Sequence, residues 1–504
     1  MKGFTKTYAN YSGSKHLFIN SEWLLISLLF GSIGAITWAI RGTAGWGGVD
    51  GTVIPGLTWG ILWYYIALRK GIDARGIVFW LGLGIALGGE LGYGQYTGWI
   101  RGNFNVGDEV IAIKPWLGYF WFTICGIGWA APGGIVLGWA LGKSVSVQVW
   151  LVRSITFAVL LVLLFSSPAI DWLGEILLKT NCGILFPNIK MGIYTDLGEH
   201  LSRTLYTNTQ NFAIVVWWIL AMFVAAWQRD KTTLISGLIL GGGFGIGFMQ
   251  SAMWTLGYDI APGYIDWWKV WELNSGFNLG VLYAIVLYWA IHIQSKKNKS
   301  EKLENKVNTK PIGINNRMTT LFLAFSGSVL LYFIGFEYFF WTGIALNLFY
   351  FLAICFTGFS FSKPESIYDK LKNTSLIYSI FLLIFLLFHG GSERFGIVFN
   401  LYELNEVSQY SWPVERIFVF VPIALFITGV VIFKIWKGVK SGYTETRWDL
   451  INPKSALRIV DLLTLIGCIG VLSIWPAKIS VFYSLFLAIA IYVFNRLEFK
   501  YRNE

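Results

Sequence analysis

The stretch ICGIGWAAPGGIVLGWALG, residues 124–142, shows which kind of fold this chain adopts. It carries no charge and, with the apolar residues before it, is long enough to cross a hydrocarbon core of about 30 Å as a helix. Glycine recurs throughout it, and small residues let membrane helices approach one another closely. We therefore expect a transmembrane helix packed inside a bundle.

Comparable apolar runs recur along all 504 residues, of which 55% are hydrophobic and 13% charged, with a mean hydropathy of +0.58. These values exclude an ordinary soluble protein. We predict an all-α polytopic integral membrane protein with about 14 transmembrane helices, within a range of about 12 to 14. The expected spans are 22–40, 53–68, 76–97, 116–141, 149–167, 210–227, 232–254, 274–294, 318–336, 339–360, 374–389, 413–433, 457–475 and 478–495. The third and seventh are so rich in glycine that either could be broken.

The distribution of Lys and Arg predicts the orientation, because cytoplasmic loops carry an excess of both. If the N- and C-termini and the basic segment KKNKSEKLENKVNTK (296–310) are cytoplasmic, the inner loops are net positive and the outer loops net negative. The net charge of +11 then reflects topology, and the inner face suits anionic membrane lipid. We expect a bacterial-type inner or plasma membrane location and no nucleic-acid partner, metal or cofactor.

The same basic segment divides the chain into two parts of different composition. Residues 1–295 form a Gly- and Trp-rich part with eight expected helices, 296–317 a cytoplasmic linker, and 318–504 a six-helix part. Within the first part, GGELGYG (88–94) and GGGFGIG (241–247) match as G-G-x-x-G-x-G, which is compatible with a parallel internal duplication. Neither continues as a dinucleotide-binding fingerprint.

Charged residues in the first part gather at the predicted outer ends of the helices. A charge at the centre of a membrane helix costs roughly 2.5 to 3.5 kcal/mol, so it needs a partner or a wet cavity. Glu90 lies within the third span and is expected to point into the bundle. Glu272 lies near the start of the eighth span and is expected to sit near the outer rim. Glu90 has a second interpretation, in which it pairs with Arg41 or Arg101 only to hold helices together.

The candidate catalytic residues are carboxylates: Glu90 as the acid, with Glu272 or Asp266 as its partner, as in glycosidic bond chemistry. Aromatic faces beside carboxylates and amides suit a sugar ring, and arginine suits a substrate phosphate or carboxylate. The candidate substrate-binding residues are Arg41, Asp50, Trp46, Gln95, Trp99, Arg101, Trp254, Asp259, Trp271, Asn274, His389, Glu393 and Arg394. Tryptophans also anchor membrane interfaces, and Asp259, Asp266, Glu272 and His389 also fit solvated or interfacial positions.

Two functions follow from this pattern. The first is a membrane-embedded enzyme whose site faces the extracytoplasmic side and hydrolyses or transfers a glycan or lipid-linked sugar. The second is a proton-coupled secondary transporter of a small polar or sugar-like solute, which the helix number and glycine-rich breaks favour. Clustering of charge at one face instead of the midplane favours the enzyme. A subunit or scaffold without chemistry is the third possibility.

Overall fold

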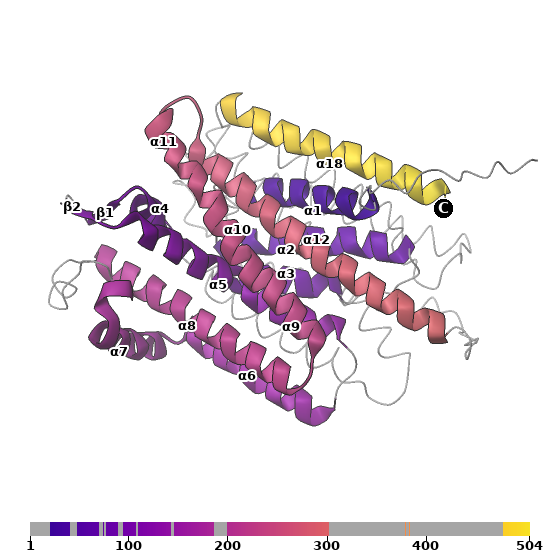
Figure 1. The fold of residues 1–504 in the computed structure, drawn as a ribbon, viewed down its shortest axis with the longest axis horizontal. Coiled ribbons are helices and arrows are strands. Elements are labelled where there is room, and N and C mark those ends of the chain that lie inside the picture. Colours follow the sequence, from indigo (N-terminus) through magenta and orange to yellow (C-terminus); the bar gives the residue numbers. More distant parts are fainter. Residues whose placement is uncertain are drawn as a thin grey trace, which may run out of the picture.

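The computed structural model describes residues 21–40, 48–69, 74, 77–88, 94–106, 109–142, 146–185, 199–301, 379, 383 and 477–503. Within them the chain is a bundle of long helices lying side by side (Figure 1). The first helices are α1 (Ser21–Ile40), α2 (Gly48–Arg69), α3 (Ile77–Gly88), α4 (Gly94–Ile100), α5 (Pro115–Leu141), α6 (Val147–Phe165), α7 (Ser167–Leu185) and α8 (Glu199–Trp227). There follow α9 (Lys231–Gly237), a π-helical turn η1 (Leu238–Gly242), α10 (Gly243–Ala252), a 3-10 turn η2 (Met253–Leu256), α11 (Gly257–Ile260), α12 (Trp267–Glu301) and α18 (Ala477–Asn503).

Six helical runs within the described residues are long and apolar enough to cross a membrane, and the bent pair α6–α7 makes a seventh if it is one span. The six lie in α1, α5, α8, α9–α11, α12 and α18. This confirms a helical chain of the membrane type. The total of about 14 spans stays a prediction. The expected spans 318–336, 339–360, 413–433 and 457–475 lie outside the described residues, and 374–389 is described only at residues 379 and 383.

Four local structures add to or differ from the sequence expectations. The third expected span is two helices, α3 and α4, with residues 89–93 between them outside the described part. The glycine-rich seventh span stays helical, and its irregularity is the π turn at Leu238–Gly242 followed by the 3-10 turn. Helix α7 was not expected at all, and α12 continues to Glu301, into the segment predicted as a linker.

A two-stranded antiparallel hairpin follows α4. Strand β1 (Asn103–Val106) pairs with β2 (Glu109–Ala112), with Val106 opposite Glu109. The expectation of an all-α chain missed it because each strand is only four residues long. The sequence nevertheless carries a hairpin signal, since Gly-Asp separates the two runs, and two-residue loops of this type connect antiparallel strands.

Glycines allow the helix backbones to touch at several crossings. A Cβ atom added at Gly34 of α1 would collide with the carbonyl oxygen of Gly276 of α12, and the reverse collision also holds. Gly84 of α3 and Gly133 of α5 meet in the same way, backbone to backbone. Because lipid tails are as apolar as the helices, such close packing is a main source of helix association in membranes. These contacts fix the helices along their length.

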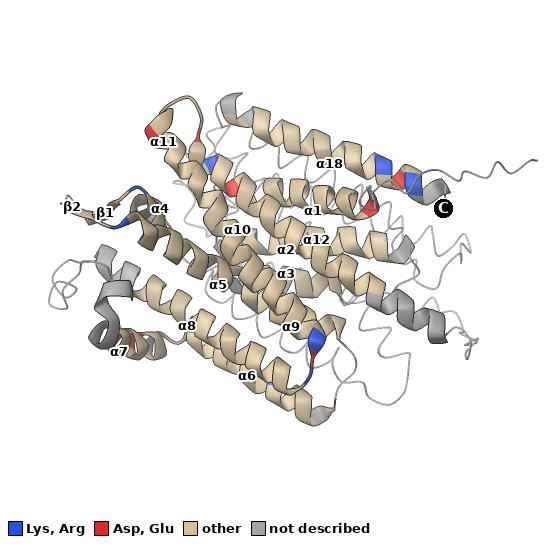
Figure 2. Cartoon of the chain, in the orientation of Figure 1, with Lys and Arg blue, Asp and Glu red and all other residues tan. Residues whose placement is uncertain are grey.

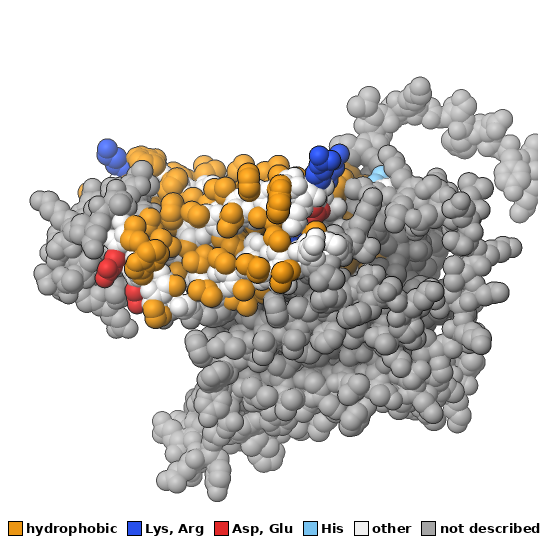
Figure 3. Space-filling view, turned by 90° about the horizontal axis from the view of Figure 1, so that it is seen from below, with side chains coloured by type: hydrophobic (Ala, Val, Ile, Leu, Met, Phe, Trp, Pro, Cys, Tyr) orange, Lys and Arg blue, Asp and Glu red, His pale blue; other side chains and the backbone are white. Residues whose placement is uncertain are grey.

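Charged side chains of the described residues lie at the two ends of the helices, with a broad zone free of charge between them (Figure 2). The face formed by the helices at the bottom of Figure 1 is covered by hydrophobic side chains between charges at either end (Figure 3). It includes exposed Leu151, Val159, Ile219 and Phe223 of α6 and α8. An exposed apolar band of this kind is typical of lipid contact.

The last helix packs against the first. Lys500 near the end of α18 lies 3.5 Å from the carboxylate of Glu22 near the start of α1, and Phe486 of α18 contacts Phe277 of α12 with ring centroids 5.9 Å apart. The beginning of α1 and the end of α18 therefore lie at the same end of the bundle. That the two termini are cytoplasmic stays a prediction. We call the opposite end, which carries α4, β1–β2, α11 and the start of α12, the α11 end (Figure 1).

Replacing Gly276 by valine is expected to lower the free energy of unfolding by about 1 to 3 kcal/mol, because the added atoms collide with the backbone of α1. Thermal unfolding in detergent measures the effect. Gly94→Ala is the control, since a Cβ there meets nothing within 4 Å. Equal melting temperatures for Gly276→Val and wild type would show that the α1–α12 crossing is not tightly packed.

The predicted orientation places the α11 end outside the cell. In a variant without native cysteines, a cysteine replacing Tyr264, which is 72% exposed, should react with a membrane-impermeant thiol reagent in intact cells. A cysteine replacing Lys231, exposed at the other end, should react only after the cells are opened. The reverse pattern would invert the topology.

Candidate functional site

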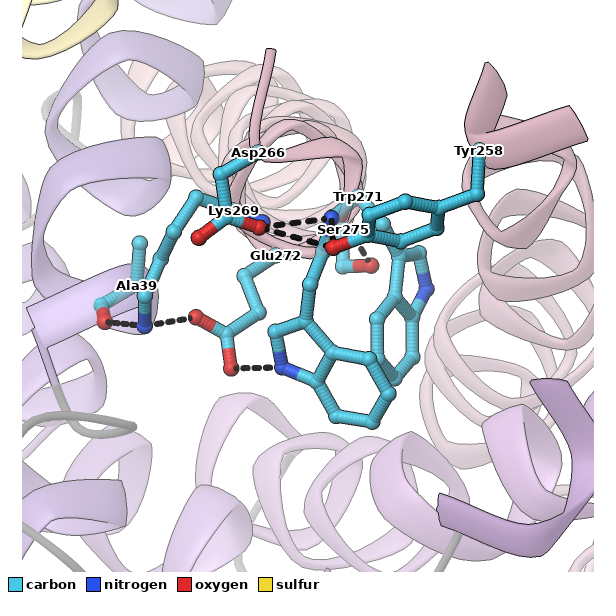
Figure 4. A network of polar contacts seen from close by, with 8 residues as sticks. Ala39, Tyr258, Asp266, Lys269, Trp271, Glu272 and Ser275 are labelled. Carbon is cyan, nitrogen blue, oxygen red and sulfur yellow. Dashed lines mark hydrogen bonds and ion pairs between the residues drawn. The ribbon is translucent and has the colours of Figure 1, made fainter. Parts of the chain in front are cut away.

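Among the described residues, the most deeply buried ion pair at the α11 end joins Lys269 and Glu272. They are one helical turn apart on α12, so their side chains share a face, and Lys269 Nζ lies 2.5 Å from Glu272 Oε2. The two residues are only 2% and 3% exposed. An ion pair removed from solvent is retained only if further hydrogen bonds complete its coordination, and this pair has them (Figure 4).

Neighbouring groups hold both charges in place. The indole N–H of Trp268 donates to Glu272 Oε1 at 3.0 Å, and Lys269 Nζ donates to the carbonyl oxygen of Ala39 at 3.4 Å. Trp271 packs edge-on against Trp268, with ring centroids 4.7 Å apart. The pair therefore links the start of α12 to the end of α1, and the indole of Trp268 contacts it. Glu272 and Trp271 are among the residues predicted from the sequence; Lys269 is not, although its i,i+3 spacing from Glu272 is visible there.

Asp266 lies just before α12 and caps the helix. Its Oδ1 accepts hydrogen bonds from the backbone N–H groups of Trp268 at 3.1 Å and Lys269 at 3.3 Å, and from the hydroxyl of Tyr258 at 3.0 Å. Helix caps satisfy N–H groups that lack a partner within the helix. Through these contacts Asp266 fixes the position of the helical turn that contains Lys269 and Glu272.

Arg101 and Asp259 form a second pair nearer the surface. Arg101 follows α4, and its Nη2 lies 2.6 Å from Asp259 Oδ1, while its Nε contacts both carboxylate oxygens at 3.0 and 3.3 Å. Their side chains are 37% and 50% exposed, so the pair contributes at most about 1 kcal/mol. The pair connects the end of α4 to α11.

The remaining candidates are placed as follows. The indole N–H of Trp254 donates to Asn274 Oδ1 at 3.1 Å, and Trp254 stacks on Trp267. Trp99 is buried, at 1% exposure, on α4. Gln95 lies on α4 and Asp50 in the first turn of α2, but their side chains are not among those described. Six candidates lie outside the described residues: Glu90, Arg41, Trp46, His389, Glu393 and Arg394.

A buried cluster of neutral polar groups was missed by the sequence analysis. The hydroxyl of Tyr96 donates to Asn208 Oδ1 at 2.7 Å and accepts from Asn211 Nδ2 at 3.2 Å, so α4 is joined to α8. Its signal was the uninterrupted polar run Thr207–Asn211, which immediately precedes the apolar part of α8. The expected span, 210–227, began within this run.

No group of three or more His, Cys, Asp or Glu side chains that could hold a metal ion occurs among the described residues. The comparisons found no matching family model, no curated protein and no solved structure similar to this chain. The geometry of the α11 end is therefore the basis for inferring function.

Replacing Lys269 by methionine should destabilise the protein by about 3 to 5 kcal/mol, because it leaves the Glu272 carboxylate buried without its counter-charge. Lys269→Met combined with Glu272→Gln should recover much of that loss, since neither charge then remains. Thermal unfolding of the single and double variants in nanodiscs measures the coupling free energy between Lys269 and Glu272. Additive losses in the double variant would mean that the two residues do not interact.

Proposed function

We propose that the protein is a membrane-embedded enzyme that hydrolyses or transfers a glycan or lipid-linked sugar at the α11 end. The observation that carries this proposal is the buried Lys269–Glu272 pair with its indole neighbour Trp268, at the end of the bundle that also holds Asp266, Arg101 and Asp259. Ionisable side chains buried in a membrane protein are costly and are usually retained for function.

In this proposal Glu272 is the carboxylate that acts in its charged form. As one half of an ion pair it carries negative charge, which fits a nucleophile, a base or a group that stabilises positive charge on a sugar ring. The second carboxylate of such chemistry must supply a proton, and Glu90 is the proposed acid. In this proposal Asp266, which caps α12, positions Glu272.

The packing of the bundle favours a preformed site. Glycine contacts bring α1 against α12 and α3 against α5, with backbone touching backbone. Alternating access requires parts of a carrier to rock against one another, and helices in backbone contact resist such movement. Catalysis benefits from the opposite property, because charges held in fixed positions need no reorganisation during reaction.

A proton-coupled transporter of a small polar or sugar-like solute is the second candidate. The π turn at Leu238–Gly242 and the 3-10 turn at Met253–Leu256 favour it, because interrupted helices form substrate sites in many carriers. Both irregular turns belong to the helical run that leads to the α11 end.

Glu272→Gln should reduce turnover at least about a hundredfold while leaving substrate binding within a few-fold of wild type. The assay follows release of reducing sugar from a panel of polysaccharides and lipid-linked sugars by the protein in nanodiscs. Glu498→Gln is the matched control, because Glu498 is a buried carboxylate on α18 near Lys500, away from the α11 end.

Unchanged turnover in Glu272→Gln would remove Glu272 from the chemistry. If wild type cleaves no glycan but accumulates a sugar in proteoliposomes when a pH gradient is imposed, the transporter replaces the enzyme. A folded Glu272→Gln variant is verified by its melting temperature, with the Lys269→Met and Glu272→Gln double variant as a second folded form lacking the carboxylate.

A further inference from the structure

Helix α8 contains an uncharged polar run, Thr207–Asn211, that is entirely buried. Each of its residues is no more than 7% exposed, and Asn208, Thr209 and Asn211 are 0% exposed. Consecutive residues on a helix point in different directions, so this part of α8 is enclosed on all sides. Polar groups are costly to bury without hydrogen bonds, and a run of them within an otherwise apolar helix calls for a specific reason.

Aromatic rings from α4 and α5 surround the point where this run meets Tyr96. The Tyr96 hydroxyl bridges Asn208 and Asn211, while its ring stacks on Trp121 with centroids 5.8 Å apart. Trp99 lies edge-on to Tyr96, with centroids 5.2 Å apart. Neutral amides and hydroxyls beside aromatic faces are the groups with which proteins bind sugar rings.

Two polar atoms near this cluster have no hydrogen-bond partner in the described part of the chain. They are the indole Nε1 of Trp99 and the hydroxyl Oγ1 of Thr209, on residues that are 1% and 0% exposed. Buried polar atoms in proteins nearly always have a partner, and an exception indicates a group that something else completes. Trp99 offers a donor, and Thr209 offers a donor or an acceptor.

We propose that Tyr96, Trp99, Asn208, Thr209 and Asn211 form a subsite for a neutral, hydroxyl-rich ring, such as one sugar unit of the substrate. The inference rests on the proposed function and specifies which part of the substrate is held there. The five residues carry no charge, which suits a neutral sugar better than an acidic or amino sugar. Tyr96 and Trp99 both lie on α4, a helix of seven residues.

Trp99→Phe and Thr209→Val test the proposal because each removes the unpartnered polar atom; valine keeps the shape of threonine, whereas the phenylalanine ring is smaller than the indole. Binding of cellobiose, maltose and lactose, with glucuronic acid and glucosamine as charged comparisons, is measured by calorimetry on the full chain in nanodiscs free of sugar-based detergent. Wild type should bind at least one neutral disaccharide and neither charged sugar. Each variant should weaken that binding about fivefold or more. Thr209→Val should leave the melting temperature unchanged or raise it, whereas Trp99→Phe should lower it because the smaller ring leaves a cavity.

Trp217→Phe is the matched control, since its buried indole N–H already donates to the carbonyl oxygen of Thr156 at 2.8 Å. It should lower the melting temperature and leave sugar binding unchanged. The subsite is disproved if wild type binds none of the neutral disaccharides. It is also disproved if sugar binding stays intact in both Trp99→Phe and Thr209→Val, whatever their melting temperatures.

The outcomes separate the subsite from the enzyme. Sugar binding that depends on Trp99 and Thr209, without turnover of any glycan, would support the subsite and remove the enzymatic proposal. Turnover that depends on Glu272 but is indifferent to both substitutions would support the enzyme and remove the subsite.

Discussion

The contact of glycine backbones between α1 and α12 is the constraint on which the rest of the described structure depends. Gly34 and Gly276 approach so closely that neither position has room for a side chain. In lipid the hydrophobic effect does not drive helices together, so their association relies on dispersion contacts and hydrogen bonds that need close approach. The same approach brings the carbonyl of Ala39 to Lys269, so the position of the ion pair follows from the helix crossing.

Tryptophan side chains fill the space that the glycines leave beside their crossings. Trp59 lies against Gly34 and donates its indole N–H to the carbonyl oxygen of Phe30 at 2.9 Å. Trp38 and Trp129 contact each other in the core with ring centroids 4.9 Å apart. Small and very large residues therefore complement one another, which gives dense packing. These tryptophans belong to the core and not to an open cavity.

Polar chemistry at the α11 end is organised in layers. The exposed Arg101–Asp259 pair connects α4 with α11, the Asp266 cap fixes the start of α12, and the Lys269–Glu272 pair lies buried beneath. Electrostatic interactions strengthen as solvent is excluded, so removing one partner of the inner pair costs more than breaking the exposed pair. The fixed position of Glu272 is what an acid–base or nucleophilic role requires.

The sequence by itself determined that the chain is built from apolar helices, because hydrophobic runs of membrane-spanning length are a local property. It also predicted that Glu272, Arg101 and Asp259 belong to one region, since the charged residues follow the helix ends. The tertiary structure alone decided their partners. Lys269, Ala39 and the Tyr96–Asn208 contact bring together residues from α1, α4, α8 and α12, and such contacts depend on how helices cross. Periodicity and composition carry no information about crossings, because they describe one helix at a time.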